Sequence, residues 1–160
     1  MAILPQLIEE DVHELDEVLS GFVTQTDAIA ALLIDKGGFL LAHRGDAENL
    51  DLTTIGALAS GAFIANQAIA QLVNEKKFTS ICQQGENFSL FVIDVDEHCL
   101  LAVIFKSQSG AGVVKYYALG ATKRIARQLA AARERNPATG LDLSAMNVAD
   151  PQEFFRKKSA

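Results

Sequence analysis

The longest stretch with a regular apolar pattern runs from Asp51 to Lys76 and has no charged side chain between Asp51 and Glu75. Its apolar positions recur at the three- and four-residue spacing of an α-helix, and Asp51 is a suitable N-cap residue. The spacing therefore predicts one long helix. At about 100° per residue, large apolar residues gather on a face that we expect to pack on a sheet: Ile55, Leu58, Ala62, Ile69 and Val73, flanked by Leu52, Phe63 and Ala70.

The far side of this helix carries mostly small side chains, at Ala57, Ser60, Gly61, Ile64 and Ala68, and its polar cover is confined to Thr53, Gln67, Gln71 and Asn74. A surface helix normally has one apolar stripe and a charged back. Without a charged back, more than one side of this helix should contact protein. The scattered polar residues disfavour a membrane span. A helix enclosed by its own chain stays open, but self-association beside a copy in a second subunit is favoured.

The segments around the long helix predict a sheet and two more helices. Residues 9–22 have helical spacing with an acidic outer face. Two apolar runs, 28–34 and 39–44, are split by Gly37 and Gly38 and predict a β-hairpin. Three further runs, 78–84, 88–95 and 98–105, have links too short for crossover helices, so they should form an antiparallel meander. The last two are nearly continuously hydrophobic, which indicates cover on both faces.

The C-terminal part divides into a helix and a tail. A helix over 113–135 should bury one face and expose basic residues; the face consists of Val114, Tyr117, Ala118, Ala121, Ile125, Leu129 and Ala132. The preceding segment 107–112 is interpreted as a capping loop rather than an anion site. Prolines and sparse apolar residues after 135 predict a flexible tail. We therefore expect one α+β domain over 1–135, with five antiparallel strands between helices in the order α-β-β-α-β-β-β-α, and a tail over 136–160.

Composition limits the classes of molecule that this protein is expected to bind. The chain of 160 residues has 49% hydrophobic residues, a formal net charge of −6 and a pI near 5.0. An acidic chain is a poor ligand for nucleic acid or anionic membranes, so protein partners are expected. Acidic residues near the N-terminus replace the apolar core of a signal peptide, and we expect a cytoplasmic protein. Cys82 and Cys99 lie in apolar or alternating runs without zinc-site spacing and are interpreted as buried thiols.

Candidate catalytic chemistry is sparse. The turn containing Asp94, Asp96, Glu97 and His98 has ligand-type side chains, but acidic residues at a hairpin tip are usually solvent-facing turn formers. No serine lies in a nucleophile elbow, and the histidines belong to separate elements. We therefore expect no catalytic residues, no metal and no cofactor, and a protein that is not itself an enzyme.

Taken together, the segments LLIDKGGFLLAHRG, DLTTIGALASGAFIANQAIAQL and LLAVIFKSQSGAGVVKYYALG, in this order, resemble the roadblock/dynein light chain family, particularly its bacterial MglB-like members. The resemblance covers residues 9–133. It implies a homodimer in which third strands pair and long helices lie side by side, with an interface at Gly61, Ala65, Thr79 and Ile81. It also implies binding of a Ras-like small GTPase at Ile64 and Ala68, with Ala57, Ser60 and Gly61 as neighbours.

Two classes of function follow, with a third less favoured. The first is a dimeric regulator of a small GTPase, and the second is an adaptor or scaffold for other proteins. The third is a small-molecule sensor that uses the cleft between sheet and helix. Because the long helix contains no arginine, an effect on GTP hydrolysis should not involve an arginine finger from this helix. Arg44, at the end of a predicted strand, is the exception to examine.

Overall fold

The computed structural model describes residues 5–135, and the predicted tail over 136–160 lies outside them. The elements in chain order are α1 (Glu9–Thr26), β1 (Ala30–Asp35), β2 (Leu40–Gly45), α2 (Leu52–Leu72), β3 (Ser80–Gln84), β4 (Phe88–Asp94), β5 (Cys99–Lys106), a short 3₁₀-helix (Ser107–Ser109) and α3 (Ala111–Arg135). This order confirms the predicted one, and every predicted element is present. The boundaries shift most for α1, which runs on to Thr26, and for α2, which ends at Leu72.

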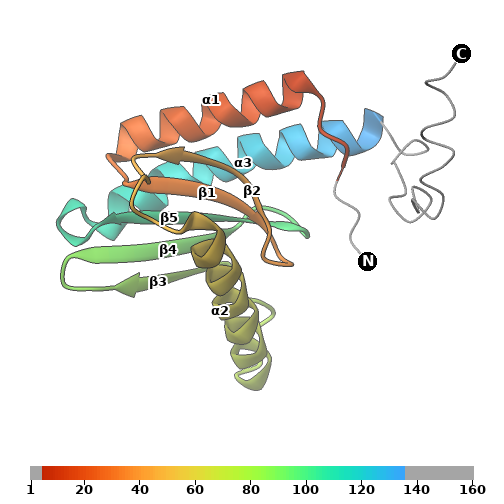
Figure 1. The fold of residues 1–160 in the computed structure, drawn as a ribbon. Coiled ribbons are helices and arrows are strands. Elements are labelled where there is room, and N and C mark those ends of the chain that lie inside the picture. Colours follow the sequence, from red (N-terminus) through yellow and green to blue (C-terminus); the bar gives the residue numbers. More distant parts are fainter. Residues whose placement is uncertain (1–4, 136–160) are drawn as a thin grey trace, which may run out of the picture.

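The five strands form one antiparallel sheet in the order β2-β1-β5-β4-β3. The β1–β2 hairpin and the β3–β4–β5 meander are as predicted, and β1 joins them by pairing with β5, from Ala30 opposite Ile104 to Asp35 opposite Cys99. Helices α1 and α3 lie side by side on one face of the sheet, and α2 crosses the other (Figure 1). The three layers confirm the α+β fold and place β3 at one sheet edge.

Two hydrophobic clusters fill the spaces between the layers. Alternate residues of the central strands point to opposite faces, so Leu33 and Leu101 pack under α1 and α3, whereas Leu32 and Leu100 pack under α2. The predicted inner face of α3 is confirmed, because Val114, Ala118, Ala121, Ile125, Leu129 and Ala132 are all buried and Tyr117 is half-buried. The cluster under α2 is the smaller one, and half-buried residues of β3, β4 and β5 border it: Ile81, Leu90 and Ile104.

The α1–α3 layer is held by a buried carboxylate. Asp11 has 0% of its surface exposed, and it accepts hydrogen bonds from Ile8 N (2.9 Å), Gln128 Nε2 (2.7 Å) and both terminal nitrogens of Arg135 (2.7 and 3.0 Å). The Arg135 guanidinium, with help from the other two donors, holds the pKa of Asp11 well below its usual range, although burial acts in the opposite direction. This residue caps α1 and fastens α3 to it.

The sequence-based expectation for the cysteines is half right. Cys99 is buried, and burial raises the pKa of its thiol to about 12. Cys82 is exposed on β3, the edge strand of the sheet, where three of the five residues are exposed. The run around Cys82 therefore belongs to a half-covered strand.

Candidate functional site: the exposed side of α2

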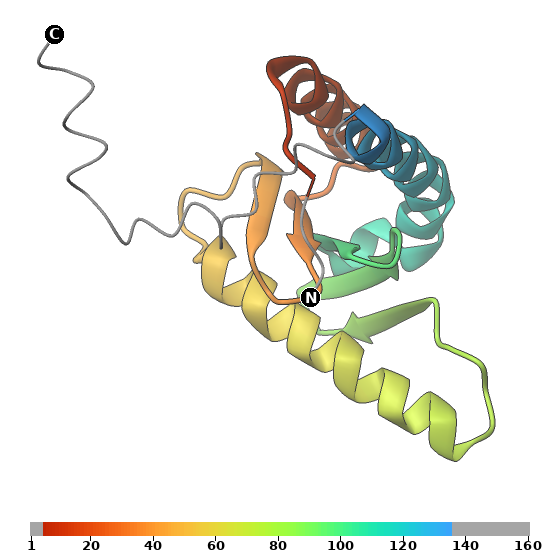
Figure 2. The ribbon, with the colours of Figure 1, turned by 90° about the vertical axis from the view of Figure 1, so that its right-hand side faces the viewer.

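Helix α2 begins at a well-formed cap. The carboxylate of Asp51 accepts hydrogen bonds from Thr54 N (3.1 Å) and Thr54 Oγ1 (2.6 Å), and these bonds lower the pKa of Asp51. The helix ends where Asn74 adopts φ of 59°, a left-handed conformation that asparagine tolerates and that breaks the helical path. These two signals set the length of α2 and leave its last turns extending beyond the sheet (Figure 2).

The side of α2 that meets the sheet differs from the predicted one. The buried residues are Leu52, Gly56, Ala59, Ser60, Phe63 and Ala70, so the positions expected to flank the sheet face form its centre. A Cβ on Gly56 would lie 3.0 Å from Ile34 Cγ2, which shows how closely the helix approaches β1. The prediction that Leu58, Ile69 and Val73 face the sheet is wrong, because small residues rather than large ones allow this close approach.

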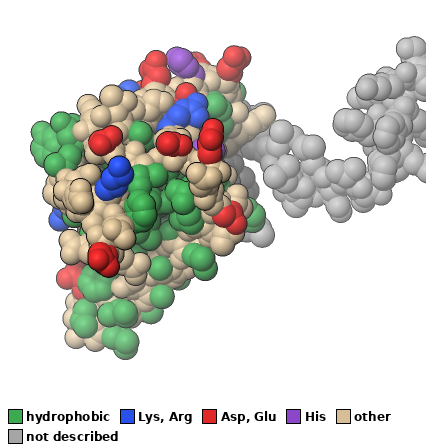
Figure 3. Space-filling view, turned by 60° about the vertical axis from the view of Figure 1, so that its left-hand side comes forward, with side chains coloured by type: hydrophobic (Ala, Val, Ile, Leu, Met, Phe, Trp, Pro, Cys, Tyr) green, Lys and Arg blue, Asp and Glu red, His purple; other side chains and the backbone are tan. Residues whose placement is uncertain are grey.

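The large apolar residues of α2 instead lie on its open side. Leu58 is 68% exposed, Ile64 51%, Ile69 49%, Leu72 83% and Val73 61%. Together with the exposed small residues Ala57, Gly61, Ala65 and Ala68, they form what we call the α2 platform. Figure 3 shows hydrophobic side chains gathered on this face and along the protruding end of the molecule. Exposed apolar surfaces of this kind are typical of sites that contact another protein, a membrane or a ligand.

Of the residues predicted to bind a partner, the structure places Ala57, Gly61, Ile64 and Ala68 on this exposed side. Ser60 is not among them. It is 2% exposed, and its hydroxyl donates a hydrogen bond to the carbonyl oxygen of Lys36 at 2.8 Å. Ser60 thus joins α2 to the β1–β2 turn, because a buried hydroxyl needs a partner. Its inclusion in the exposed face was wrong.

Of the predicted dimer residues, Gly61 and Ala65 belong to α2, Ile81 belongs to β3 and Thr79 directly precedes β3. Gly61, Ala65 and Thr79 are exposed and Ile81 is half-buried. Strand β3 pairs with β4 on one side only, so the other edge of β3 is open in the described part of the chain. A Cβ on Gly61 would meet nothing within 4 Å, so the single chain does not require glycine there. Each of these residues is placed where a second chain could reach it.

Gln67, predicted to be a solvated surface residue, has a structural role that the pattern did not reveal. Its amide donates to Phe78 O at 2.7 Å and accepts from Phe78 N at 3.1 Å. This pair of bonds fixes the chain at the entry to β3 relative to α2. A lone glutamine on a predicted helix carries no local signal for such a contact, since its partner is eleven residues away.

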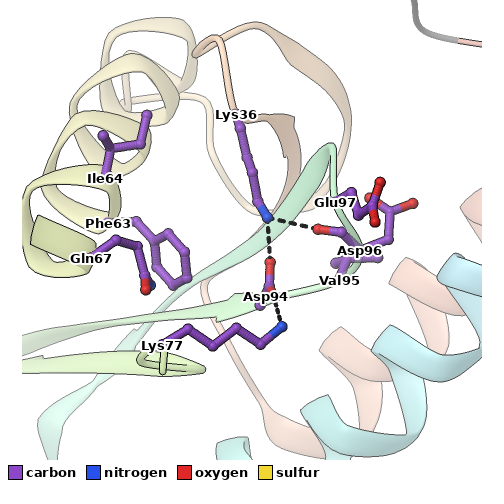
Figure 4. A pocket seen from close by; sticks show the side chains of 9 residues that line it. All are labelled: Lys36, Phe63, Ile64, Gln67, Lys77, Asp94, Val95, Asp96 and Glu97. Carbon is purple, nitrogen blue, oxygen red and sulfur yellow. Dashed lines mark hydrogen bonds and ion pairs between the residues drawn. The ribbon is translucent and has the colours of Figure 1, made fainter. Parts of the chain in front are cut away.

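A cleft of about 580 Å³ lies beside α2, between Phe63, Ile64 and Gln67 and the β4–β5 turn (Figure 4). On its floor, Lys36 Nζ pairs with Asp94 Oδ1 at 2.7 Å and donates to Asp96 O at 2.7 Å, while Lys77 Nζ pairs with Asp94 Oδ2 at 3.1 Å. The Asp94 side chain is only 13% exposed. The expectation of a solvent-facing acid is wrong for Asp94, because two lysines enclose its carboxylate.

The acidic turn is also tied to α3. Asp96 accepts hydrogen bonds from His98 N and Cys99 N, both at 2.8 Å, and pairs with Arg133 at 3.1 Å. These contacts account for Asp94 and Asp96 as structural residues. Within residues 5–135, no group of three or more His, Cys, Asp or Glu side chains is positioned to hold a metal ion.

Arg44 lies on the opposite side of the sheet from α2. It forms an ion pair with Asp16 of α1. Helix α2 is the one helix of the described residues that is long and apolar enough to cross a membrane. Hydrogen bonds from Ser60 and Gln67, however, join it to the β1–β2 turn and to the segment that precedes β3. The exposed apolar surface of α2 is thus the outer face of a helix whose other side packs on the sheet.

Comparison with known proteins agrees with this architecture. The Roadblock/LC7 domain family model matches residues 14–105, and the chain belongs to this family. It is an MglB-like member: an MglB solved "with tetrameric arrangement" is 32% identical, with a TM-score of 0.77, over 82% of this chain and 99% of that one. The gliding protein MglB from Thermus thermophilus is also 32% identical, with a TM-score of 0.75, over 82% and 99% of the two chains.

Myxococcus xanthus MglB shares the fold at 24% identity, with a TM-score of 0.74, over 79% of this chain and 96% of that one. A comparison with curated proteins found no significant match. The Thermus thermophilus relative is a gliding protein, and membership of the Roadblock/LC7 family is consistent with a regulatory or adaptor protein.

Proposed function

We propose that this chain forms a homodimer through α2 and β3 and presents the paired α2 helices to a Ras-like small GTPase, whose nucleotide cycle it modulates. The observation that carries the proposal is the α2 platform, a helix fixed to the sheet by one side and apolar on the other. The similarity to MglB supports it.

The dimer is proposed from two incomplete surfaces. The open edge of β3 offers unpaired backbone groups that a second β3 can satisfy, which extends the sheet across the dimer. Beside it, Gly61 and Ala65 are small enough for a second α2 to approach closely. The half-buried Ile81 would then be covered. The tetrameric arrangement of a relative supports self-association in this group of proteins.

The GTPase contact is proposed at Ala57, Ile64 and Ala68, which follow one another on the same side of α2 at helical spacing. Neither α2 nor β3 contains an arginine, and Arg44 is paired on the far side of the sheet. An arginine finger acts by placing a cation at the transferring phosphate. We therefore infer that any acceleration of hydrolysis comes from positioning the residues of the GTPase itself.

Single-turnover GTP hydrolysis by a Ras-like GTPase, with and without this protein, tests the proposal. We expect Ala68→Arg to abolish binding and any effect on hydrolysis or nucleotide exchange, because a long cation would stand in an apolar contact. Arg44→Ala should leave both unchanged. Ala130→Arg makes the same substitution at an exposed alanine of α3 and serves as the control.

Sedimentation at micromolar concentration should show a dimer for wild type and for Ala68→Arg, and a monomer for Gly61→Glu. A monomeric wild type would refute the dimer. If Arg44→Ala eliminates the effect on hydrolysis while Ala68→Arg retains it, the proposed contact is wrong. Binding without any change in hydrolysis or exchange would identify an adaptor instead of a regulator.

A further inference from the structure

The face of the molecule opposite to α2 carries a second exposed apolar site. A groove of about 530 Å³ runs between α1 and α3. Tyr116 protrudes beside it with 72% of its surface exposed, and Leu119 is 49% exposed. Gly21 and Gly120 line the groove, and a Cβ on either would meet nothing within 4 Å. One face thus combines a protruding aromatic side chain with an open space.

The two helices are antiparallel, and side-chain contacts give their register. Arg124 pairs with Glu14 at 2.8 Å, and Gln128 donates to Asp11 at 2.7 Å. With a rise of about 1.5 Å per residue on both helices, Tyr116 lies near the level of Phe22 and Val23, within about 3 Å of the level of Gly21. By the same reasoning, Lys123 lies near the level of Leu15 and Asp16, within about 3 Å of the level of Glu17.

The exposed charges on the two helices have opposite signs. Helix α1 contains no lysine or arginine, and by helical spacing Glu10, Glu14 and Glu17 fall on the same side of α1 as Gly21 and Gln25, which line the groove. Helix α3 has one acidic residue, Glu134. Arg124 lines the groove, and by helical spacing Lys123 and Arg127 fall on the same side of α3 as Tyr116 and Gly120. The charged residues lie toward the end of the groove at Arg124, and Gly21, Gln25, Val113 and Tyr116 lie toward the other end.

We propose that this groove binds the same groove of a second copy of the chain, around a two-fold axis parallel to the helices. This axis places α1 of each copy over α3 of the other, so that the two copies together form a four-helix layer in which neighbouring helices are antiparallel. Because the axis is parallel to the helices, equivalent residues of the two copies lie at the same height along it. Acidic α1 then faces basic α3, and Glu14 and Arg124 of both copies form a ring of alternating charge. A two-fold axis across the helices would place α1 on α1, where like charges repel.

The arrangement around this axis also fits the shape of the groove. Because levels are preserved, Tyr116 of each copy lies over Gly21 of the other, where the absence of a side chain leaves room for the ring. Tyrosine is well suited to such a contact, since it supplies a large area at low cost in conformational entropy. Glu17 of each copy lies closest to Lys123 of the other. The contact is therefore self-complementary in both shape and charge.

The interface is small. Two helices side by side, over about four turns, present a face of roughly 20 by 20 Å, which is below the standard interface of about 800 Å² per partner. We expect association near 100 µM, the range of weak and transient contacts. Because the groove and α2 lie on opposite faces of the sheet (Figure 1), this contact and the proposed α2–β3 dimer can form together.

Light scattering and sedimentation from about 5 to 500 µM test the contact. Every protein carries Gly61→Glu, so that the proposed α2–β3 dimer does not contribute. The protein with Gly61→Glu alone, which is the parent of the other variants, should change from monomer to dimer as its concentration rises. Glu17→Lys and Lys123→Glu should each weaken association about tenfold, because each reversal acts twice in a symmetric interface. The double variant Glu17→Lys/Lys123→Glu should restore it to within about threefold.

Lys106→Glu changes the charge equally at an exposed site outside the groove and should have no effect. Glu17 and Lys123 are exposed, so all variants should unfold at the parent temperature. A parent that stays monomeric to 500 µM overturns the inference, as does a double variant no better than either single one. The α2–β3 dimer is tested separately by wild type without Gly61→Glu at low concentration, so the failure of one contact is distinguishable from the failure of the other.

Discussion

Asp11→Asn should destabilise the domain by about 2 to 3 kcal/mol. The wild-type carboxylate is fully buried and receives four hydrogen bonds, two of them from Arg135. Removing one charge from a buried ion pair costs about 3 to 5 kcal/mol. The Arg135 side chain is 37% exposed, so water compensates part of the loss and reduces the expected cost to about 2 to 3 kcal/mol. For a domain of this size, the change corresponds to a melting temperature lower by roughly 4 to 12 °C.

The effect should depend on pH in a direction set by the pKa of Asp11. The folded state lowers this pKa below its usual 3.8, mainly through Arg135. A carboxyl whose pKa is lowered stabilises the fold above its unfolded pKa and loses that contribution as pH falls through the folded value. The difference between wild type and Asp11→Asn should therefore be constant from about pH 5 to 8 and should shrink below about pH 4.

Thermal unfolding followed by circular dichroism, at one protein concentration across this pH range, measures the difference. Glu9→Gln is the matched control. It removes an acidic group from the same first turn of α1, but its side chain is exposed and makes no ion pair in the described residues. We expect a change below about 0.5 kcal/mol for the control. A difference for Asp11→Asn that is as large at pH 3 as at pH 7 would refute the electrostatic explanation.

Two further predictions concern local geometry. Gly45 has φ of 121°, and a Cβ there would lie 2.1 Å from Ile29 O, so Gly45→Ala should destabilise the domain by more than about 3 kcal/mol. A Cβ on Gly112 would meet no atom within 4 Å, so Gly112→Ala should be neutral or stabilise the domain by up to about 1 kcal/mol. Equal melting temperatures for the two variants would contradict this prediction. In the native protein at pH 8, a thiol reagent should label exposed Cys82 rapidly and leave Cys99 unmodified, because burial raises the pKa of Cys99 to about 12. Mass spectrometry of the labelled peptides shows which cysteine is modified.

The sequence by itself determined the elements and their connections. Apolar periodicity located all three helices, and links too short for crossover helices made 78–105 a meander. Glycines at 37 and 38 marked the hairpin turn, where Gly38 has φ of 97°. The inner face of α3 was predictable because its basic residues leave one apolar side. The segments that resemble the roadblock family carried the same order, and the family match confirms it.

Only the tertiary structure decided how α2 is turned on the sheet. A helix that is apolar on every side gives no local signal for its buried face, and size misled the prediction. The close contact belongs to Gly56 and Ala59, which let the helix approach the sheet, while Leu58 and Leu72 remain exposed.

The same holds for the polar contacts of the site. Ser60, Gln67 and Asp94 look like surface residues in the sequence, but Lys36 O, Phe78 and two lysines bind them in the fold. Their partners lie eleven to fifty-eight residues away along the chain. Distant pairings of this kind depend on how the layers pack, because local periodicity reports only which residues share a face and not what that face meets.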